Sequence, residues 1–191
     1  MARPRTFDPQ DILLKAREIF WSKGYQSTTL DDITAATGLT KPSLYAGFGD
    51  KASLFLKVLD DYHDRLVARA AGILSDAPTA RVAVETWLMS LLPISSGKKG
   101  RRGCLSVNTL TDGGPRDAAV EKSIANYNAR LENLILARLQ ADRAKFPPDF
   151  DPAAVSRTIM AVYAGLMAMA KQTQSEQQVR QVIGQVSKLL S

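Results

Sequence analysis

The sequence predicts an all-α fold, because helix signals recur along its 191 residues. Apolar residues repeat at helical spacing, as Ile12, Ala16 and Phe20 do near the N-terminus. Asp8-Pro9 and Asp151-Pro152 each combine a capping side chain with a proline suited to the first helical position. No segment reads as a convincing strand. We therefore expect a chain built from helices alone.

The first two helices are predicted from their caps. The first begins at Pro9 and stops at Gly24, since glycine is a common residue just after a helix. The second runs to Thr37, and Thr28 with Asp31 three residues later forms a variant of the capping box that marks helix N-termini. Both helices should be short.

A third short helix follows at once. Gly38 breaks the second helix, and Thr40 caps a helix from Lys41 to about Phe48. Two short helices joined by a glycine-containing turn of this length form a helix-turn-helix unit. We expect residues 1–50 to form one domain, a three-helix unit that contains this motif.

Six further helices are expected in residues 51–191, which would form a second, larger helical domain. Their approximate ranges are 51–75, 79–92, 104–111, 116–145, 152–172 and 176–190.

The composition excludes several classes of protein. The 45% apolar and 23% charged residues give an ordinary soluble balance. No uncharged apolar run reaches the roughly 18 residues of a membrane span, and Ile159–Ala170 is the longest. The N-terminus lacks the apolar stretch of a signal peptide, and the lone Cys104 cannot form an intrachain disulfide. We expect a cytoplasmic protein with no membrane partner.

The net charge of +6 says little about nucleic acid. Residues 1–50 contain as many acidic as basic side chains, whereas residues 97–103 contribute four positive charges with no acid. We expect this glycine-flanked tract to be a solvated loop; the alternative is a dedicated anion site.

The eighth predicted helix indicates a homodimer. Ile159–Ala170 is apolar on every side, so it should be buried on all sides. One face would pack in its own domain and the other against a second subunit; the alternative is a central helix inside one bundle. The residues assigned to the interface, from the eighth and ninth helices, are Ala161, Ala164, Gly165, Ala168, Val179, Val182, Ile183 and Val186.

Residues 30–54, LDDITAATGLTKPSLYAGFGDKASL, resemble the signature of TetR/AcrR transcriptional regulators. Upstream, Ala16, Phe20 and the segment GYQSTT at residues 24–29 resemble the family's first helix and the junction after it. The chain departs from the pattern at Thr34, where alanine is usual, and at Gly47, where many members carry a phosphate-contacting residue. The later helices resemble the family only in number, length and total size.

The resemblance implies that the third helix enters the major groove of DNA. Thr40, Lys41, Pro42 and Ser43 would lie at its leading end, Tyr45 would bond a phosphate, and Lys51 with Thr28 would anchor the flanking backbone. The alternatives are that Thr28 and Thr40 only cap helices and that Tyr45 belongs to the core. Arg3 and Arg5 would form either a minor-groove arm or a disordered terminus.

The resemblance also implies an effector cavity in the second domain. The candidate lining residues are Tyr62, Trp87, Leu91, Cys104, Asn108, Tyr127, Tyr163 and Met167. The effector would be a small, largely apolar molecule, with hydrogen bonds from Asn108 and Tyr127. The alternative for each aromatic residue and methionine is a plain core position.

Two residues bear on other chemistries. His63 is the only histidine, which excludes zinc sites built from several histidines and cysteines; we expect a solvated helix residue. We expect Cys104 to be a buried small hydrophobe; the alternative is a redox or electrophile sensor, activated by Lys99, Arg101 and Arg102.

These patterns predict a regulator that binds a pseudo-palindromic double-stranded operator as a homodimer, without a cofactor. Repression relieved by a small-molecule effector is the default that the resemblance implies. One alternative is a regulator that acts by contacting another protein. The other is a helical enzyme, which the absence of paired catalytic groups makes improbable.

Overall fold

A computed structural model of the chain describes residues 7–96, 102–111, 113–115, 117–172 and 175–190. These residues form ten α-helices, one short 3₁₀ helix and no strand, which confirms the all-α prediction. Arg3, Arg5, Lys98, Lys99 and Arg101 lie outside the described residues. The elements are α1 (Pro9–Lys23), α2 (Leu30–Thr37), α3 (Lys41–Phe48), α4 (Lys51–Asp76), α5 (Ala80–Met89), α6 (Leu92–Ser95), α7 (Leu105–Thr111), α8 (Ala118–Ala141), η1 (Arg143–Lys145), α9 (Pro152–Met169) and α10 (Glu176–Lys188).

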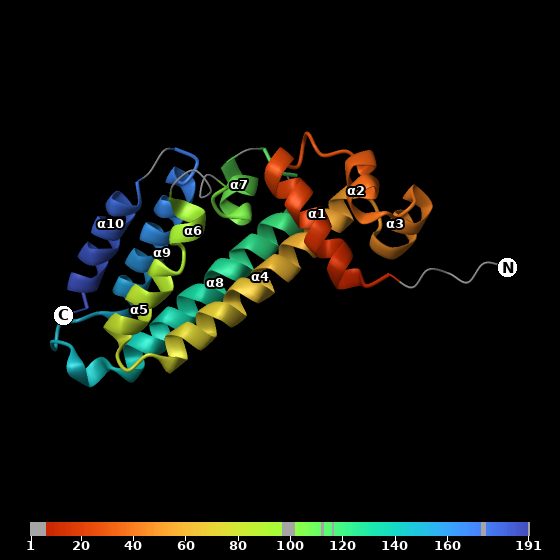
Figure 1. Ribbon diagram of the computed structural model, residues 1–191. Coiled ribbons are helices and arrows are strands. Elements are labelled where there is room, and N and C mark those ends of the chain that lie inside the picture. Colours follow the sequence, from red (N-terminus) through yellow and green to blue (C-terminus); the bar gives the residue numbers. More distant parts are fainter. Residues whose placement is uncertain (1–6, 97–101, 112, 116, 173–174, 191) are drawn as a thin grey trace.

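Helices α1, α2 and α3 form a small head at the N-terminal end of the molecule (Figure 1). The apolar stripe of α1 faces inward, as the spacing of its residues Ile12, Ala16 and Phe20 predicts. Ile33 of α2 and Leu44 of α3 are fully buried beside them, so the two short helices are held together by their apolar faces.

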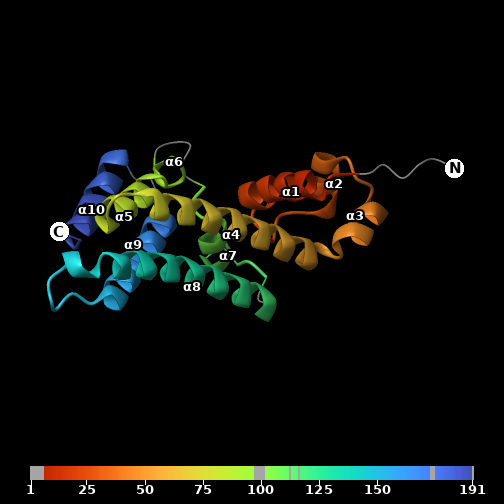
Figure 2. The same cartoon turned by 90° about the horizontal axis from the view of Figure 1, so that it is seen from below.

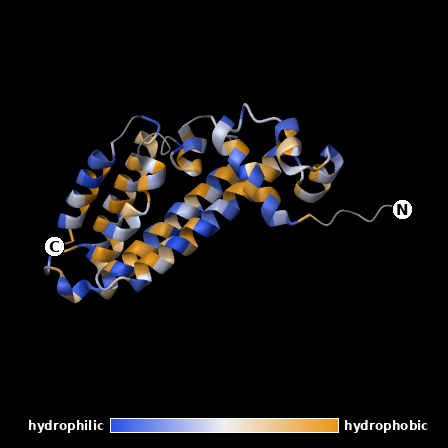
Figure 3. Cartoon of the chain, in the orientation of Figure 1, coloured by the Kyte–Doolittle hydropathy of each residue, from blue (hydrophilic) through white to orange (hydrophobic). Residues whose placement is uncertain are grey.

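The body consists of α4 to α10. The long helices α4 and α8 run side by side along the molecule in both views (Figures 1 and 2) and pack against each other. Helices α5, α9 and α10 lie at the end away from the head, and α7 lies between the head and this bundle. Hydrophobic positions follow α4, α5, α8 and α9 (Figure 3), where the shared core forms.

The predicted N-caps Asp8, Thr40 and Asp151 are confirmed, and Asp50 and Ser175 cap two further helices. The backbone N–H groups of the first turns donate to the side chains of Asp8, Thr40, Asp50, Asp151 and Ser175. These five side chains fix where α1, α3, α4, α9 and α10 begin.

The predicted cap of α2 is wrong by one residue. The Asp32 N–H donates to the Thr29 hydroxyl at 3.1 Å, and the Thr29 N–H donates to Asp32 Oδ2 at 2.9 Å. Thr28 instead turns inward, where its hydroxyl donates to the Gly24 carbonyl oxygen at 2.7 Å. The capping box therefore consists of Thr29 and Asp32.

The fifth helix, predicted over residues 79–92, ends early, and a separate short helix follows it. Helix α5 ends at Met89, and a turn at Ser90 and Leu91 leads into α6. Pro93 has no N–H to donate to the Met89 carbonyl, so α5 cannot continue through it.

Asp142 links the N-terminal end of α5 to the C-terminal end of α8. Its carboxylate accepts the Ala80 N–H at 2.6 Å, which satisfies a free donor in the first turn of α5. Lys145 at 2.9 Å and Arg138 at 3.3 Å balance its charge. These cations and the hydrogen bonds hold the pKa of Asp142 below its usual value.

Helix α9 is buried on one side only within a single chain. Ile159, Tyr163 and Met167 face the core. The opposite face exposes Ala161, Ala164, Gly165 and Ala168. The alternative of a central helix inside one bundle is therefore wrong. Of the described helices, α9 alone is long and apolar enough to cross a membrane by length and composition, and core helices of soluble proteins share these features.

Three residues assigned to the dimer interface belong to the core of their own chain. Val179, Ile183 and Val186 are buried on α10, which packs against α5. Their spacing of four and three residues places them on the same inward stripe. Val182 lies off this stripe and is 40% exposed.

Candidate nucleic-acid interface and ligand pocket

Helix α3 presents a polar face at the outer end of the head (Figure 1). Leu44 and Phe48, four residues apart, are buried and fix its orientation. The side chains left exposed are those of Thr40, Lys41, Pro42, Tyr45 and Ala46, while Ser43 is half-buried. The structure thus brings together the N-cap Thr40 and the four α3 residues that the sequence assigns to DNA.

The leading end of α3 is organised by its cap. The Ser43 N–H donates to the Thr40 hydroxyl at 3.3 Å, and the two hydroxyl oxygens lie 2.9 Å apart. Thr40 therefore caps the helix and remains exposed at the same time. The first-turn N–H groups carry the positive end of the helix dipole, which favours an anion here.

Lys41 pairs with an acid of the neighbouring helix. Its ammonium lies 2.7 Å from Asp31 Oδ1, and both side chains are mostly exposed. Exposed pairs contribute little to stability, about 0–1 kcal/mol. Lys41 can therefore leave Asp31 for a base edge or a phosphate at small cost.

Tyr45 is half-exposed, so the alternative that it belongs to the core is wrong. Lys51 lies against the loop after α1, with its ammonium 4.4 Å from the centre of the Tyr25 ring and 3.4 Å from the Gln26 carbonyl oxygen. This cation–π contact holds it beside the head. Thr28 is only 1% exposed, so its assignment as an anchor for the DNA backbone is wrong.

Two further lysines frame the head, and the sequence patterns singled out neither. The Lys57 ammonium lies 3.3 Å from the Gly47 carbonyl oxygen and 5.5 Å from the centre of the Phe48 ring. Lys23 lies 2.5 Å from Asp32, and this contact with those to Thr29 lowers the pKa of Asp32 to about 2. Lys57 adds charge near α3, whereas Lys23 is engaged with Asp32.

Most of the predicted pocket residues form one buried cluster around Cys104. The Tyr62 and Tyr163 hydroxyls donate to its sulfur at 3.6 and 3.4 Å, and the hydroxyl oxygens of Tyr163 and Tyr127 lie 2.8 Å apart. Burial raises the pKa of all three phenols, so they remain protonated donors. Cys104 is fully buried, as expected of a small hydrophobe.

The cluster leaves little room for a ligand. The space beside Trp87, Leu91, Tyr127 and Tyr163 is about 40 Å³. Ligand pockets usually measure about 300–1,000 Å³. The space on this side of the cluster is too small for such a ligand, because the Tyr163 and Trp87 ring centres lie 5.5 Å apart and the tyrosine hydroxyls bond to one another. Tyr127 and Tyr163 also border a second space of about 290 Å³ beside α7, α8 and α9.

The prediction that His63 is solvated is wrong. The ring is 2% exposed and stacks on Tyr127 at 4.3 Å between centres. Nε2 lies 2.6 Å from the Ser106 hydroxyl and Nδ1 lies 3.1 Å from the Ser123 hydroxyl. Burial, helped by the positive charge of Arg130, lowers the pKa of His63 to about 4.

Asn108 and Met167 are buried in different surroundings. Met167 is fully buried in the core, whereas the Asn108 amide donates to the Arg102 carbonyl oxygen at 2.6 Å. Asn108 thus faces the junction between α7 and the head, away from the tyrosine cluster.

Comparisons with known proteins agree with this arrangement. The family model for bacterial regulatory proteins of the tetR family matches residues 12–58, and the model for the tetracyclin repressor-like C-terminal domain matches residues 78–186. The HTH-type transcriptional repressor ComR of Escherichia coli K12 is 29% identical over 98% of this chain and 90% of its own. The repressor BdcR of the same organism is 32% identical over 93% and 86%.

A solved structure shows a close likeness over the whole chain. A cysteine mutant of the TetR family transcriptional regulator CifR, complexed with 26-bp double-strand operator DNA, superimposes with a TM-score of 0.85. The two chains are 28% identical, and the match covers 98% of each. With the exposed face of α3 and the two family models, this likeness leads to one conclusion: the chain belongs to the TetR family and is a DNA-binding transcriptional regulator, not an enzyme.

Proposed function

We propose that the protein is a homodimeric repressor that binds a pseudo-palindromic operator and is released from it by a small-molecule effector. The observation that carries the proposal is the exposed face of α3 at the outer end of the head. The names of the relatives ComR and BdcR support repression. Residues 1–50 would read DNA, and residues 51–191 would bind the effector and dimerise. We expect it to act in the cytoplasm, where its operator is.

The contacts follow from the exposed side chains. The major groove of DNA is about 12 Å wide and admits one helix. Thr40, Lys41, Pro42 and Ser43 would face base edges, with Lys41 exchanging Asp31 for a guanine. The Tyr45 hydroxyl would donate to a phosphate, and Lys51 would hold the neighbouring backbone. Phosphate contacts position the helix, whereas base contacts select the sequence.

The uncovered face of α9 supports the dimer. Ala161, Ala164, Gly165 and Ala168 are exposed small residues that would allow two copies of α9 to approach closely. A Cβ built on Gly165 meets nothing within 4 Å in the single chain. Val182 adds an exposed apolar side chain on α10. Two such faces would bury each other around a twofold axis.

The test is a fluorescence-anisotropy titration of the operator, first located by genomic footprinting. Tyr45→Phe should weaken binding to all sequences alike, because it deletes a phosphate hydrogen bond. Lys41→Ala should weaken operator binding about tenfold and relax the base preference at one position. Lys15→Ala, which removes the same charge from α1, is the matched control, and its smaller effect should not depend on the sequence.

Wild-type affinity should also fall steeply as salt rises. If Tyr45→Phe and Lys41→Ala both bind the operator as the wild type does, α3 is not the reader. A wild type that does not prefer its operator to unrelated DNA would instead favour a regulator that acts by contacting another protein.

A further inference from the structure

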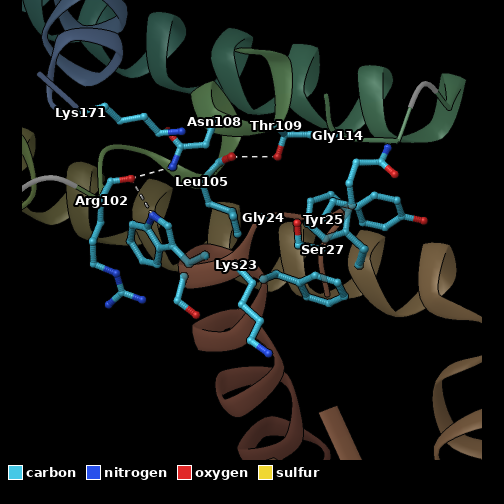
Figure 4. Close-up of a pocket in the computed structure, with 15 residues that line it drawn as sticks. Lys23, Gly24, Tyr25, Ser27, Arg102, Leu105, Asn108, Thr109, Gly114 and Lys171 are labelled. Carbon is cyan, nitrogen blue, oxygen red and sulfur yellow. Dashed lines mark hydrogen bonds between the residues drawn. The ribbon is translucent and has the colours of Figure 1, made fainter. Parts of the chain in front are cut away.

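The head and the body meet across a junction that side chains do not fill. The chain passes from one to the other once, at Gly49 and Asp50. A space of about 420 Å³ lies between the residues at the end of α1 and those of α7 (Figure 4). On this side, the angle of the head on the body therefore depends on discrete contacts that cross the junction rather than on continuous packing.

Arg102 contacts α1 across this junction in three ways. Its carbonyl oxygen accepts the Trp21 indole N–H at 3.0 Å (Figure 4). Its guanidinium lies 4.6 Å from the centre of the Trp21 ring and 2.8 Å from the Glu18 carboxylate. Elsewhere at the junction, the Gln26 amide donates to the Gly113 carbonyl oxygen at 2.9 Å. Arg102 thus joins the last two turns of α1 to the body by a hydrogen bond, a cation–π contact and an ion pair.

Arg102 is itself fixed on the body. The Asn108 amide donates to the same carbonyl oxygen at 2.6 Å (Figure 4). Gly103 follows with a φ of +62°, and a Cβ there would lie 2.9 Å from the Met167 carbonyl oxygen, so glycine alone fits against α9. Cys104 comes next and is fully buried in the tyrosine cluster. The contacts to α1 therefore start from a segment that the body holds in place.

We propose that Arg102, together with Trp21, is a positioning residue for operator binding. It sets the angle of the head on the body, and thereby the distance between the two copies of α3 in the dimer. A change in the direction of α1 carries α3 with it, because both share the buried core of the head. A dimer whose heads are already held at the operator spacing loses less freedom on binding. The inference rests on the proposed function and names residues that set its geometry.

The variants separate this role from a general effect on the fold. Arg102→Met removes the ion pair and the cation–π contact and keeps the backbone hydrogen bonds. The ion pair is exposed, and exposed pairs contribute little to stability. Arg17→Met is the matched control, because Arg17 lies 3.2 Å from the same Glu18 carboxylate and 6.0 Å from the same Trp21 ring but belongs to α1 itself. Arg102→Lys keeps the charge and is the conservative variant.

The test titrates the full-length proteins with the operator, with a single half-site and with an operator that carries one extra base pair at its centre. The insertion moves the half-sites apart by about 3.4 Å and rotates one relative to the other. Arg102→Met should bind the operator about fivefold more weakly, at the low end of usual couplings between sites, and should bind the half-site as the wild type does. Its discrimination against the insertion should also fall about fivefold. Arg102→Lys should restore most of both losses, and Arg17→Met should change all three affinities by the same factor.

Trp21→Phe, which deletes the indole N–H and keeps an aromatic ring, should reduce the discrimination in the same direction. An equal loss on all three duplexes in Arg102→Met, or no loss on any, overturns the positioning role and leaves the repressor proposal standing. The same loss of discrimination in Arg17→Met, or a large loss of thermal stability confined to Arg102→Met, also overturns it. A wild type that binds the operator no more tightly than the half-site defeats the paired reading in the proposed function, and the positioning role with it.

Discussion

At the scale of single residues, His63 is held neutral by its surroundings. The Ser123 hydroxyl lies 2.5 Å from Asp60 Oδ1 and donates to it, so Ser123 must accept its other hydrogen bond from His63 Nδ1–H. Nε2 is then the acceptor for the Ser106 hydroxyl. This chain of bonds assigns the tautomer with the proton on Nδ1. A second proton would add a charge to a ring that is almost fully buried.

Because the pKa of His63 falls from 6.5 to about 4 on folding, the unfolded chain binds a proton first as pH is lowered. The stability due to the neutral ring is complete above pH 6.5 and is lost as pH falls toward 4. Between pH 7 and pH 5 this loss is about 2 kcal/mol.

Urea unfolding at the two pH values checks this prediction against His63→Gln, which does not titrate there. The wild type should lose about 2 kcal/mol more than the variant over the interval. An equal loss in both proteins would show that His63 does not titrate in this way.

Local patterns predicted only some of the site residues. The exposure of Lys41 and Tyr45 follows from helix period and caps, which the sequence around α3 contains. The burial of His63 depends on Ser106 and Ser123, which lie 43 and 60 residues away in the sequence. The prediction for Thr28 is wrong by one position, because Thr29 is the exposed cap and the Thr28 hydroxyl is buried.

At the scale of helices, starts were predicted better than partners. Caps and prolines are local, so α1, α3, α4, α9 and α10 begin where expected. The side of α10 that is buried depends on its packing against α5, which lies far away in the sequence. The assignment of Val179, Ile183 and Val186 to the dimer interface is wrong for this reason, because they are buried within their own chain. The tyrosine cluster was likewise identified as a group, yet its packing density could not be predicted from residue types.

The shifted capping box gives a test at this scale. Thr29→Ala removes the side chain that accepts the Asp32 N–H and should reduce the free energy of unfolding by about 1 kcal/mol. Thr34→Ala removes a hydroxyl inside the same helix that bonds only the Asp31 carbonyl oxygen, and it should change stability by less than about 0.5 kcal/mol. Thermal and urea unfolding measure both. Equal effects would mean that the box does not stabilise α2.

At the scale of the whole molecule, we propose that the exposed apolar face of α9 packs against a second subunit. Gly165→Arg places a long charged side chain on that face and should convert the dimer to a monomer. Gly72→Arg is the matched control, because Gly72 is also an exposed helical glycine with open space around its Cβ. Light scattering at micromolar concentration should give about twice 20.8 kDa for the wild type and Gly72→Arg. A monomeric wild type, or a dimer unaffected by Gly165→Arg, contradicts this interface.

The central claim is that two copies of α3 read one operator together, and hydroxyl-radical footprinting of the bound duplex tests it most directly. A dimer that places its helices in successive major grooves should protect two half-sites related by a twofold axis, with centres about 10 base pairs or a multiple of that apart, or roughly 34 Å per turn. Lys41→Ala should weaken both protected regions together. Protection of one half-site alone, or a footprint that Lys41→Ala and Tyr45→Phe leave unchanged, would contradict the account.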